Sequence, residues 1–172
     1  MSNALVLVDF QKEWTNPESD DFLGDIKQLV QRTNKLIDFC RKKGCKIIFT
    51  RHVEKDSVDA WSEKSEGTRL LDELHKEKQD VIITKHKISP FYQSKLDKEL
   101  GDSEKIIVAG ILTNMCVRSL IQDAYDRDFE ITVIKDCCAT YDKKTQEFTF
   151  KDLKATREKI EFLNVKEFVK ST

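Results

Sequence analysis

The sequence is poor in the residues that build nucleotide-binding loops and disulfide frameworks. Its 172 residues include only five glycines, and no two of them have the spacing of a dinucleotide-binding fingerprint or a P-loop. The five cysteines are an odd number and include no Cys-x-x-Cys pair, which argues against a fully paired disulfide framework. The apolar runs are short and fall far below the roughly 18 residues that a membrane-spanning helix needs.

An excess of charge of one sign is also missing. The chain has 30 Lys and Arg residues against 31 Asp and Glu residues, a formal net charge of -1. Without a strongly basic field, we expect neither nucleic acid nor a membrane surface as a partner. No basic segment or cleavage site follows Met1, so we expect a cytoplasmic protein with reduced thiols. The length fits one domain that spans residues 1–172.

Short apolar runs alternate with segments of helical periodicity along the whole chain. The runs are rich in β-branched residues, which is typical of strands buried on both faces. They cover residues 4–8, 46–50, 81–84, 105–109 and 130–134, and a weaker sixth run covers 166–169. Helices are expected at 25–43, 97–100, 117–128 and 151–162. This alternation predicts an α/β fold, a three-layer α-β-α sandwich around a mainly parallel, Rossmann-like, six-stranded sheet.

Chemically useful side chains follow three of the expected strands. Asp9, Lys85 and Cys116 come after the first, third and fourth runs, respectively. Ligands of open α/β sheets bind outside the carboxyl ends of the strands, so an acid, a base and a thiol should converge on one edge. The polar segment 51–67 is long enough to be a lid or a binding loop beside them.

Cys116 stands after a strand and a glycine-containing turn, directly before a helical segment. A thiol at a helix N-terminus has a lowered pKa, and the unpaired N–H groups there could bind an oxyanion. Asp9 could accept its proton, and Lys85 could balance the charges. Spacing alone leaves other interpretations open: a small buried thiol, an aspartate that caps a turn and a surface lysine. We interpret the other four thiols, Cys40, Cys45, Cys137 and Cys138, as structural.

Three motifs stand in order over residues 4–140. They are Leu5-Val-Leu-Val-Asp9-Phe-Gln11, then Ile83-Thr-Lys85-His-Lys-Ile-Ser89-Pro-Phe91, and finally Gly110-Ile-Leu-Thr113-Asn-Met-Cys116-Val-Arg118, which is followed by Asp136-Cys-Cys-Ala139. In order and spacing, this set resembles the isochorismatase-like cysteine hydrolases, the superfamily that includes nicotinamidase and N-carbamoylsarcosine amidase. Each motif is weak alone, but all three together at strand ends are highly specific.

The resemblance implies a role for each residue. Cys116 would be the nucleophile, Asp9 would take the thiol proton and later activate water, and Lys85 would position Asp9 and stabilise charge. A non-proline cis peptide would join Ile111 and Leu112, and the N–H groups of Leu112 and Cys116 would form the oxyanion hole. The implied activity is hydrolysis of a small amide or carbamoyl compound through a thioester, as in N-carbamoylsarcosine amidase.

The expected substrate pocket lies beside these residues. Its wall would contain Phe10, Trp14, Arg51, His52 and Phe91. Carbamoyl amidases of this family bind a substrate carboxylate with arginine, a role that Arg51 or Arg118 could fill. The family also implies a homo-oligomer, a dimer or tetramer, in which neighbouring subunits close the pocket around the small-molecule substrate.

The segment after the second strand departs from the nicotinamidase pattern. Nicotinamidases carry Asp-x-His and further histidines there to hold a metal, whereas this chain has His52 without ligand spacing to His75 or His86. We therefore expect no metal and no cofactor, and we interpret His52 as hydrogen-bonded in the pocket wall. A metal held by His52 with Glu54 or Asp56 is the alternative.

Other functions remain as alternatives to a carbamoyl amidase. Isochorismatase-type and nicotinamidase-type hydrolysis are possible on the same catalytic residues. A non-catalytic binding protein of the same fold is disfavoured by the intact set of Asp9, Lys85 and Cys116. A redox protein with Cys116 as a sensor thiol is disfavoured because no resolving cysteine is evident.

Overall fold

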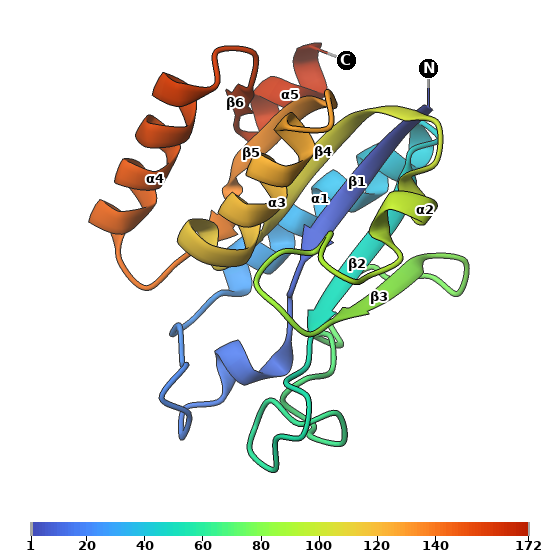
Figure 1. Ribbon diagram of the computed structural model, residues 1–172. Coiled ribbons are helices and arrows are strands. Elements are labelled where there is room, and N and C mark those ends of the chain that lie inside the picture. The colour runs from blue at the N-terminus through green and yellow to red at the C-terminus, as the bar shows by residue number, and fades with distance from the viewer. Residues whose placement is uncertain (1, 172) are drawn as a thin grey trace.

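The computed structural model describes residues 2–171 and has a six-stranded sheet as its middle layer (Figure 1). All neighbouring strands are parallel, in the order β3-β2-β1-β4-β5-β6. The strands are β1 (Ser2–Val8), β2 (Lys46–His52), β3 (Val81–Lys85), β4 (Ser103–Ile111), β5 (Glu130–Ala139) and β6 (Glu161–Leu163). The predicted parallel α/β architecture is confirmed.

Helices cover both faces of this sheet. They are α1 (Lys27–Lys42), α2 (Leu96–Leu100), α3 (Arg118–Tyr125), α4 (Lys143–Thr156) and α5 (Val165–Ser171), with a 3-10 turn η1 (Lys12–Thr15) and a π-helical turn η2 (Thr113–Val117). One hydrophobic core packs α1 and α5 against the sheet, and a second core packs α2, α3 and α4 against the opposite face. Among the described residues, no helix is long and apolar enough to cross a membrane.

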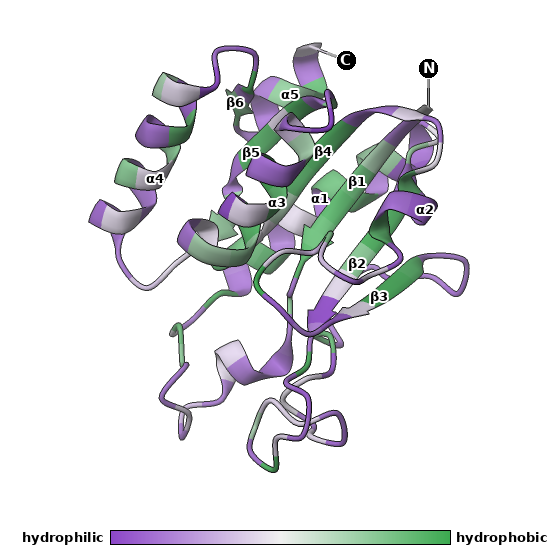
Figure 2. Cartoon of the chain, in the orientation of Figure 1, coloured by the Kyte–Doolittle hydropathy of each residue, from purple (hydrophilic) through white to green (hydrophobic). Residues whose placement is uncertain are grey.

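The central strand β1 shows why the apolar runs are continuous. Leu5 and Leu7 point into the core under α1, whereas Ala4, Val6 and Val8 point into the opposite core. All five side chains are fully buried. Because successive side chains of a strand alternate between faces, a strand covered on both sides must be apolar throughout. Figure 2 shows this concentration of apolar residues in the strands.

The weak sixth run at 166–169 is a helix, so that strand prediction is wrong. These residues lie in α5. The Asn164 side chain accepts a hydrogen bond from the Glu167 N–H at 2.9 Å, and the Glu167 carboxylate accepts one from the Asn164 N–H at 2.8 Å. This reciprocal capping box starts a helix. The buried residues Val165 and Phe168 then have helical spacing toward α1.

The helix expected at 151–162 is also corrected. The helix α4 begins earlier, where the Asp142 side chain accepts a hydrogen bond from the Thr145 N–H at 2.8 Å, and it ends at Thr156. The last residues of the expected helix form β6 instead, which pairs with β5. The sheet therefore has the expected number of strands, but its sixth strand precedes the segment that we expected.

Gly110 brings the ends of β1 and β4 close together. It aligns with Val8 in the parallel pairing. A Cβ atom at position 110 would lie 2.5 Å from the Val8 Cβ atom and 2.6 Å from the Val8 carbonyl oxygen. Only glycine fits this approach without displacing β1. The residues that follow these two strands, Asp9 and the turn with Cys116, therefore start from adjacent points.

Candidate active site

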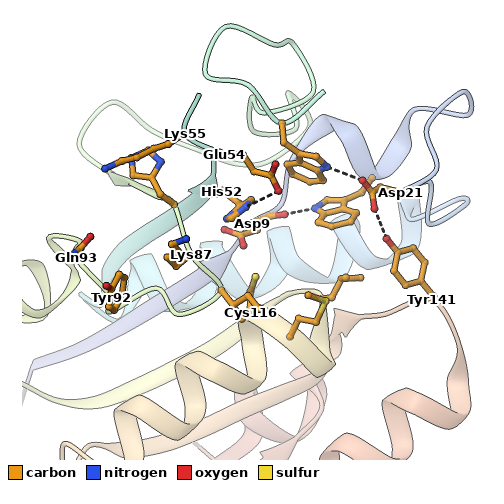
Figure 3. A pocket seen from close by; sticks show the side chains of 16 residues that line it. Asp9, Asp21, His52, Glu54, Lys55, Lys87, Tyr92, Gln93, Cys116 and Tyr141 are labelled. Atoms are coloured by element: carbon orange, nitrogen blue, oxygen red, sulfur yellow. Dashed lines mark hydrogen bonds and ion pairs between the residues drawn. The ribbon is translucent and has the colours of Figure 1, made fainter. Parts of the chain in front are cut away.

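The three expected catalytic residues meet at the carboxyl edge of the sheet, and Figure 3 shows two of them, Asp9 and Cys116. Asp9 directly follows β1, Lys85 is the last residue of β3, and Cys116 lies in η2 after β4. The Lys85 side chain reaches across β2, and its Nζ atom lies 2.8 Å from Asp9 Oδ2 and 3.3 Å from Cys116 Sγ. Asp9 and Lys85 are almost completely buried. The ammonium therefore joins the acid and the thiol in one buried cluster.

Hydrogen bonds fix the backbone of Asp9 and one of its two carboxylate oxygens. Its backbone has a φ angle of 52°, and its N–H donates to the Thr50 carbonyl at 3.1 Å. The Thr50 hydroxyl donates to Asp9 Oδ1 at 2.6 Å, and the Trp14 indole N–H donates to the Asp9 carbonyl at 2.7 Å. The other carboxylate oxygen, Oδ2, faces the Lys85 ammonium at 2.8 Å. This oxygen can accept a proton.

Lys85 remains charged in this buried position. Burial lowers the pKa of Lys85, but the Asp9 carboxylate and the contact with the Cys116 sulfur raise it by a larger amount, so the net pKa is above the usual 10.5. The ammonium also donates to the Lys87 carbonyl at 3.1 Å and lies 3.3 Å from His52 Nδ1. An ammonium group only donates hydrogen bonds, so Nδ1 of His52 must be the acceptor in this pair.

The Cys116 thiol differs from the prediction in its ionisation. Burial and the charge of Asp9 raise the pKa of Cys116, Lys85 offsets only part of this rise, and the net pKa is about 12. The lowered pKa that we expected from a helix N-terminus is therefore wrong. The reason is that the Cys116 thiol lies in a largely desolvated position within η2, which disfavours its charged form. The resting group is a thiol rather than a thiolate.

The turn between β4 and Cys116 has the geometry that the resemblance implied. The peptide bond between Ile111 and Leu112 is cis. The Leu112 carbonyl accepts hydrogen bonds from the N–H groups of Met115 at 3.1 Å and Val117 at 3.2 Å. Leu112 and Cys116 both line the pocket above the cluster. The assignment of their N–H groups to an oxyanion hole stays a prediction.

The pocket has a volume of about 720 Å3, within the usual range for small-molecule sites. Its wall is assembled from several loops. The lining residues are Asp9, Trp14, Asp21, His52, Glu54, Lys55, Trp61, His86, Lys87, Ile88, Tyr92, Gln93, Leu112, Met115, Cys116 and Tyr141. Of the five expected substrate-binding residues, Trp14 and His52 are in this wall.

The other three expected pocket residues do not line this cavity. Phe10 is fully buried in the core under α1. Phe91 is buried in the opposite core, with the Arg127 guanidinium 4.3 Å above its ring. Arg51 donates from Nε to the Thr84 hydroxyl at 3.0 Å.

The second arginine considered for a substrate carboxylate is also engaged elsewhere. Arg118 does not line this cavity and pairs with Asp152 of α4.

Sequence reasoning missed several residues of the wall. Asp21, Trp61 and Tyr141 come from irregular segments, where no periodicity marks a position. The Trp61 indole N–H donates to Asp21 Oδ2 at 2.7 Å, and the Tyr141 hydroxyl donates to Asp21 Oδ1 at 3.0 Å. One signal was available for Trp61. It is one of only two tryptophans in the chain, and it lies in the 51–67 segment that we expected to be a lid or binding loop.

The histidine that could have held a metal lacks the necessary partners. His52 Nε2 and Glu54 Oε1 are 4.0 Å apart, and Nδ1 of the same ring faces the Lys85 ammonium. No cluster of three or more His, Cys, Asp or Glu side chains suited to a metal ion exists in the described range 2–171. Burial and the Lys85 charge lower the pKa of His52, so its imidazole is neutral at pH 7. These residues do not fit a metal site of the nicotinamidase kind.

Comparisons with known proteins agree with the fold and with the motifs. The Isochorismatase domain family model matches residues 3–161. Nicotinamidase 3 of Arabidopsis thaliana is 26% identical over 165 residues, which cover 87% of this chain and 79% of that protein.

Two solved structures share the fold along nearly the whole chain. A cysteine hydrolase from Pseudomonas syringae pv. phaseolicola 1448A superposes with a TM-score of 0.89 at 22% identity, over 98% of this chain and 91% of that one. N-carbamoylsarcosine amidase from Thermoplasma acidophilum gives a TM-score of 0.80 at 23% identity, over 96% and 97%. At these identities the two structures show the fold alone. The family model, which spans most of the chain, shows that this protein belongs to the isochorismatase family.

Proposed function

We propose that the protein is a cysteine-dependent hydrolase of a small amide or carbamoyl compound. The observation that carries this proposal is the buried cluster in which Lys85 Nζ lies 2.8 Å from Asp9 Oδ2 and 3.3 Å from Cys116 Sγ, at the base of the pocket. A nucleophile, a proton acceptor and a fixed positive charge are the groups that acyl transfer requires.

The first half of the reaction forms a thioester. Cys116 Sγ attacks the carbonyl carbon of the substrate, and its proton passes to Asp9 Oδ2. The N–H groups of Leu112 and Cys116 stabilise the negative charge on the carbonyl oxygen; each donor of this kind contributes about 2.7–4 kcal/mol to lowering the barrier. Asp9 then gives the proton to the departing nitrogen, the C–N bond breaks, and the amine leaves.

The second half regenerates the thiol. Asp9 accepts a proton from a water molecule, whose oxygen attacks the thioester carbon. The C–S bond breaks, the acid product leaves, and the proton held by Asp9 returns to the Cys116 sulfur. The proton count closes, because Asp9 and Cys116 end in the forms in which they began.

The raised pKa of Cys116 fits this use of Asp9. A thiol with a pKa of about 12 supplies almost no thiolate at neutral pH, so attack requires proton removal at the moment of bond formation. Asp9 Oδ2 is the acceptor that lies beside the shared Lys85 ammonium. We assign Lys85 the role of holding Asp9 in place and balancing the negative charge that moves between carboxylate and sulfur.

Nicotinamidase-type hydrolysis is the second candidate. It is supported by the similarity to Nicotinamidase 3, which extends over 87% of this chain. The His52 and Glu54 pair weighs against it, because two donors 4.0 Å apart lack a third ligand among the described residues. A carbamoyl or simple amide substrate needs no such ion.

Release of ammonia from a panel of primary amides and N-carbamoyl compounds tests this proposal. We expect turnover of at least one compound by the unaltered protein and a loss of more than about 1000-fold in Cys116→Ala and in Asp9→Asn. Cys45→Ser is the matched control, since it removes a thiol at the amino end of β2, away from the pocket. Equal turnover by Cys116→Ala would overturn the proposal.

A further inference from the structure

One end of the pocket combines aromatic rings with carboxylates. Trp14 comes from η1, Trp61 from the long segment between β2 and β3, and Tyr141 from the segment after β5. Asp21 and Glu54 line the same part of the cavity, and the Glu54 N–H donates to the Trp61 carbonyl at 2.9 Å. In Figure 3, Asp21 and Tyr141 lie on the opposite side of Cys116 from Gln93 and Tyr92.

The polar atoms of the three aromatic side chains are already engaged within the protein. The Trp14 indole N–H donates to the Asp9 carbonyl at 2.7 Å, and the Trp61 indole N–H donates to Asp21 Oδ2 at 2.7 Å. The Tyr141 hydroxyl donates to Asp21 Oδ1 at 3.0 Å. Burial and this bond raise the pKa of Tyr141 to about 12, so the phenol remains a donor. These rings therefore offer a ligand their π faces rather than N–H or O–H groups.

The arrangement of the two indoles disfavours a flat ring between them. The Trp14 and Trp61 ring centroids are 4.9 Å apart, and their planes are inclined at 57°. A ring sandwiched between two others needs about 7 Å between the outer planes, twice the usual carbon contact distance. The indoles instead touch each other and form adjoining walls, which suit a compact group.

The basic groups in and under the pocket are paired, uncharged or away from the aromatic end. The Lys85 ammonium is paired with Asp9. His52, whose ring lies 5.9 Å from that of Trp61, is neutral because burial and the Lys85 charge lower its pKa. Lys55 and Lys87 are solvent-exposed and lie away from Asp21 in Figure 3. The aromatic end therefore carries the negative charge of Asp21 and Glu54, and among residues 2–171 neither carboxylate has an ion pair with a lysine or an arginine.

We propose that this end of the pocket binds a cationic group of the substrate, a primary or methylated ammonium, and that Asp21 sets the preference for it. The inference rests on the proposed hydrolase function and names the substrate class. Cations bind over aromatic faces through the ring quadrupole, and a nearby fixed carboxylate adds Coulombic attraction. Asp21 is fixed because two donors from distant segments orient it.

Isosteric substrate pairs provide the test. In each pair, a trimethylammonium group or a tert-butyl group is joined to a primary amide through one to three methylene groups. The two members have nearly the same shape, and alkaline hydrolysis of each amide corrects for differences in intrinsic reactivity. For the best chain length, we expect kcat/KM of the cationic member to exceed that of the neutral member by about 5- to 30-fold.

Two carboxylate variants examine the source of the preference. Asp21→Asn keeps the size of the side chain and should reduce the cation preference by at least about threefold, because kcat/KM of the cationic member falls by more than that of the neutral member. Glu54→Gln, at an exposed side chain, should reduce the preference by a smaller factor. The matched control is Asp20→Asn, which removes an exposed charge from the same loop outside the pocket.

Binding to Cys116→Ala separates this inference from the proposed function. Calorimetry of the same pairs reports the cation preference without turnover, and tighter binding of the cationic member supports the inference even if no amide is hydrolysed. Equal binding of both members, or no binding of either, overturns the inference about the cation site. The proposed hydrolase function would still stand if hydrolysis depends on Cys116. A parallel loss for both members in Asp21→Asn also overturns it, because Asp21 would then only hold the loops together.

Discussion

Replacing Lys85 with methionine should destabilise the protein strongly, because it leaves the Asp9 carboxylate buried without a partner. The two groups are 2.8 Å apart, and both side chains are at most 1% exposed. At an effective dielectric constant of about 20, that separation corresponds to an attraction of about 6 kcal/mol. Relaxation and water entry recover part of it, so we expect the free energy of unfolding to fall by about 3–5 kcal/mol at pH 7.

Urea denaturation followed by circular dichroism measures this effect. The sign of its pH dependence follows from the charge left behind. A protonated Asp9 needs no partner, so the stability deficit of Lys85→Met should shrink as the pH is lowered from neutral. Lys143→Met is the matched control. Its ion pair with Glu147 spans 3.5 Å between side chains that are 88% and 67% exposed, so no measurable loss is expected.

A double-mutant cycle identifies the cause of the loss. Asp9→Asn combined with Lys85→Met removes both charges, and the double variant should recover most of the stability that the lysine variant lost. A Lys85→Met protein within about 1 kcal/mol of the unaltered protein, with the same stability difference at every pH, would refute the reasoning about the buried pair.

Three further predictions follow from the structure. Gly110→Ala should lower the free energy of unfolding by about 1–3 kcal/mol in the same denaturation assay and should lower activity, because the new methyl group overlaps Val8 of β1. Unchanged stability would contradict the close approach of β4 to β1 at this position. The kcat/KM of the hydrolase should stay constant from about pH 7.5 to about pH 10, because the pKa of Cys116 is raised to about 12 and that of Lys85 is above 10.5. A change in kcat/KM with a midpoint near pH 8.5 would instead indicate a thiol with an ordinary pKa. The hydrogen bond with Cys40 lowers the pKa of Cys45, whereas the pKa of Cys116 is raised. Iodoacetamide labelling, followed by peptide mapping, should therefore reach Cys45 at a lower pH and before Cys116; the reverse order would contradict this.

The meeting of the acid and the thiol could be predicted from the sequence because both follow runs that are apolar throughout. Such runs are buried on both faces, which implies parallel strands with their carboxyl ends at one edge. Asp9 and Cys116 follow β1 and β4, which are neighbours in the sheet. Lys85 follows β3, an edge strand, and its inclusion depended on motif resemblance in addition to the strand pattern.

The pocket wall could not be predicted in the same way. Asp21, Trp61 and Tyr141 come from irregular segments, and the hydrogen bonds that join them span 40 and 120 residues of sequence. Phe10 shows the limit of arguing from proximity in sequence. It is adjacent to Asp9 but lies in the hydrophobic core, while Trp14 lies farther along the chain and reaches the pocket.

The predictions of the thiol pKa and of the C-terminal strand failed for different reasons. A position just before a helix suggests a lowered pKa for Cys116, but the degree of burial that reverses the effect depends on the tertiary packing of loops. At the C-terminus, a four-residue apolar pattern cannot separate strand from helix by periodicity. The capping box formed by Asn164 and Glu167 stabilises the start of a helix here. Asn164 precedes the segment that we interpreted as a strand, and Glu167 lies within it.

Mass spectrometry during turnover tests the central claim most directly. Acid quenching of the protein with a hydrolysed amide should preserve an adduct with the mass of the acyl group. Peptide mapping should place the adduct on Cys116, and it should be missing from Cys116→Ala, which should also have lost turnover. Continued turnover by Cys116→Ala, or an adduct on another residue that accounts for the rate, would contradict catalysis by the Asp9, Lys85 and Cys116 cluster.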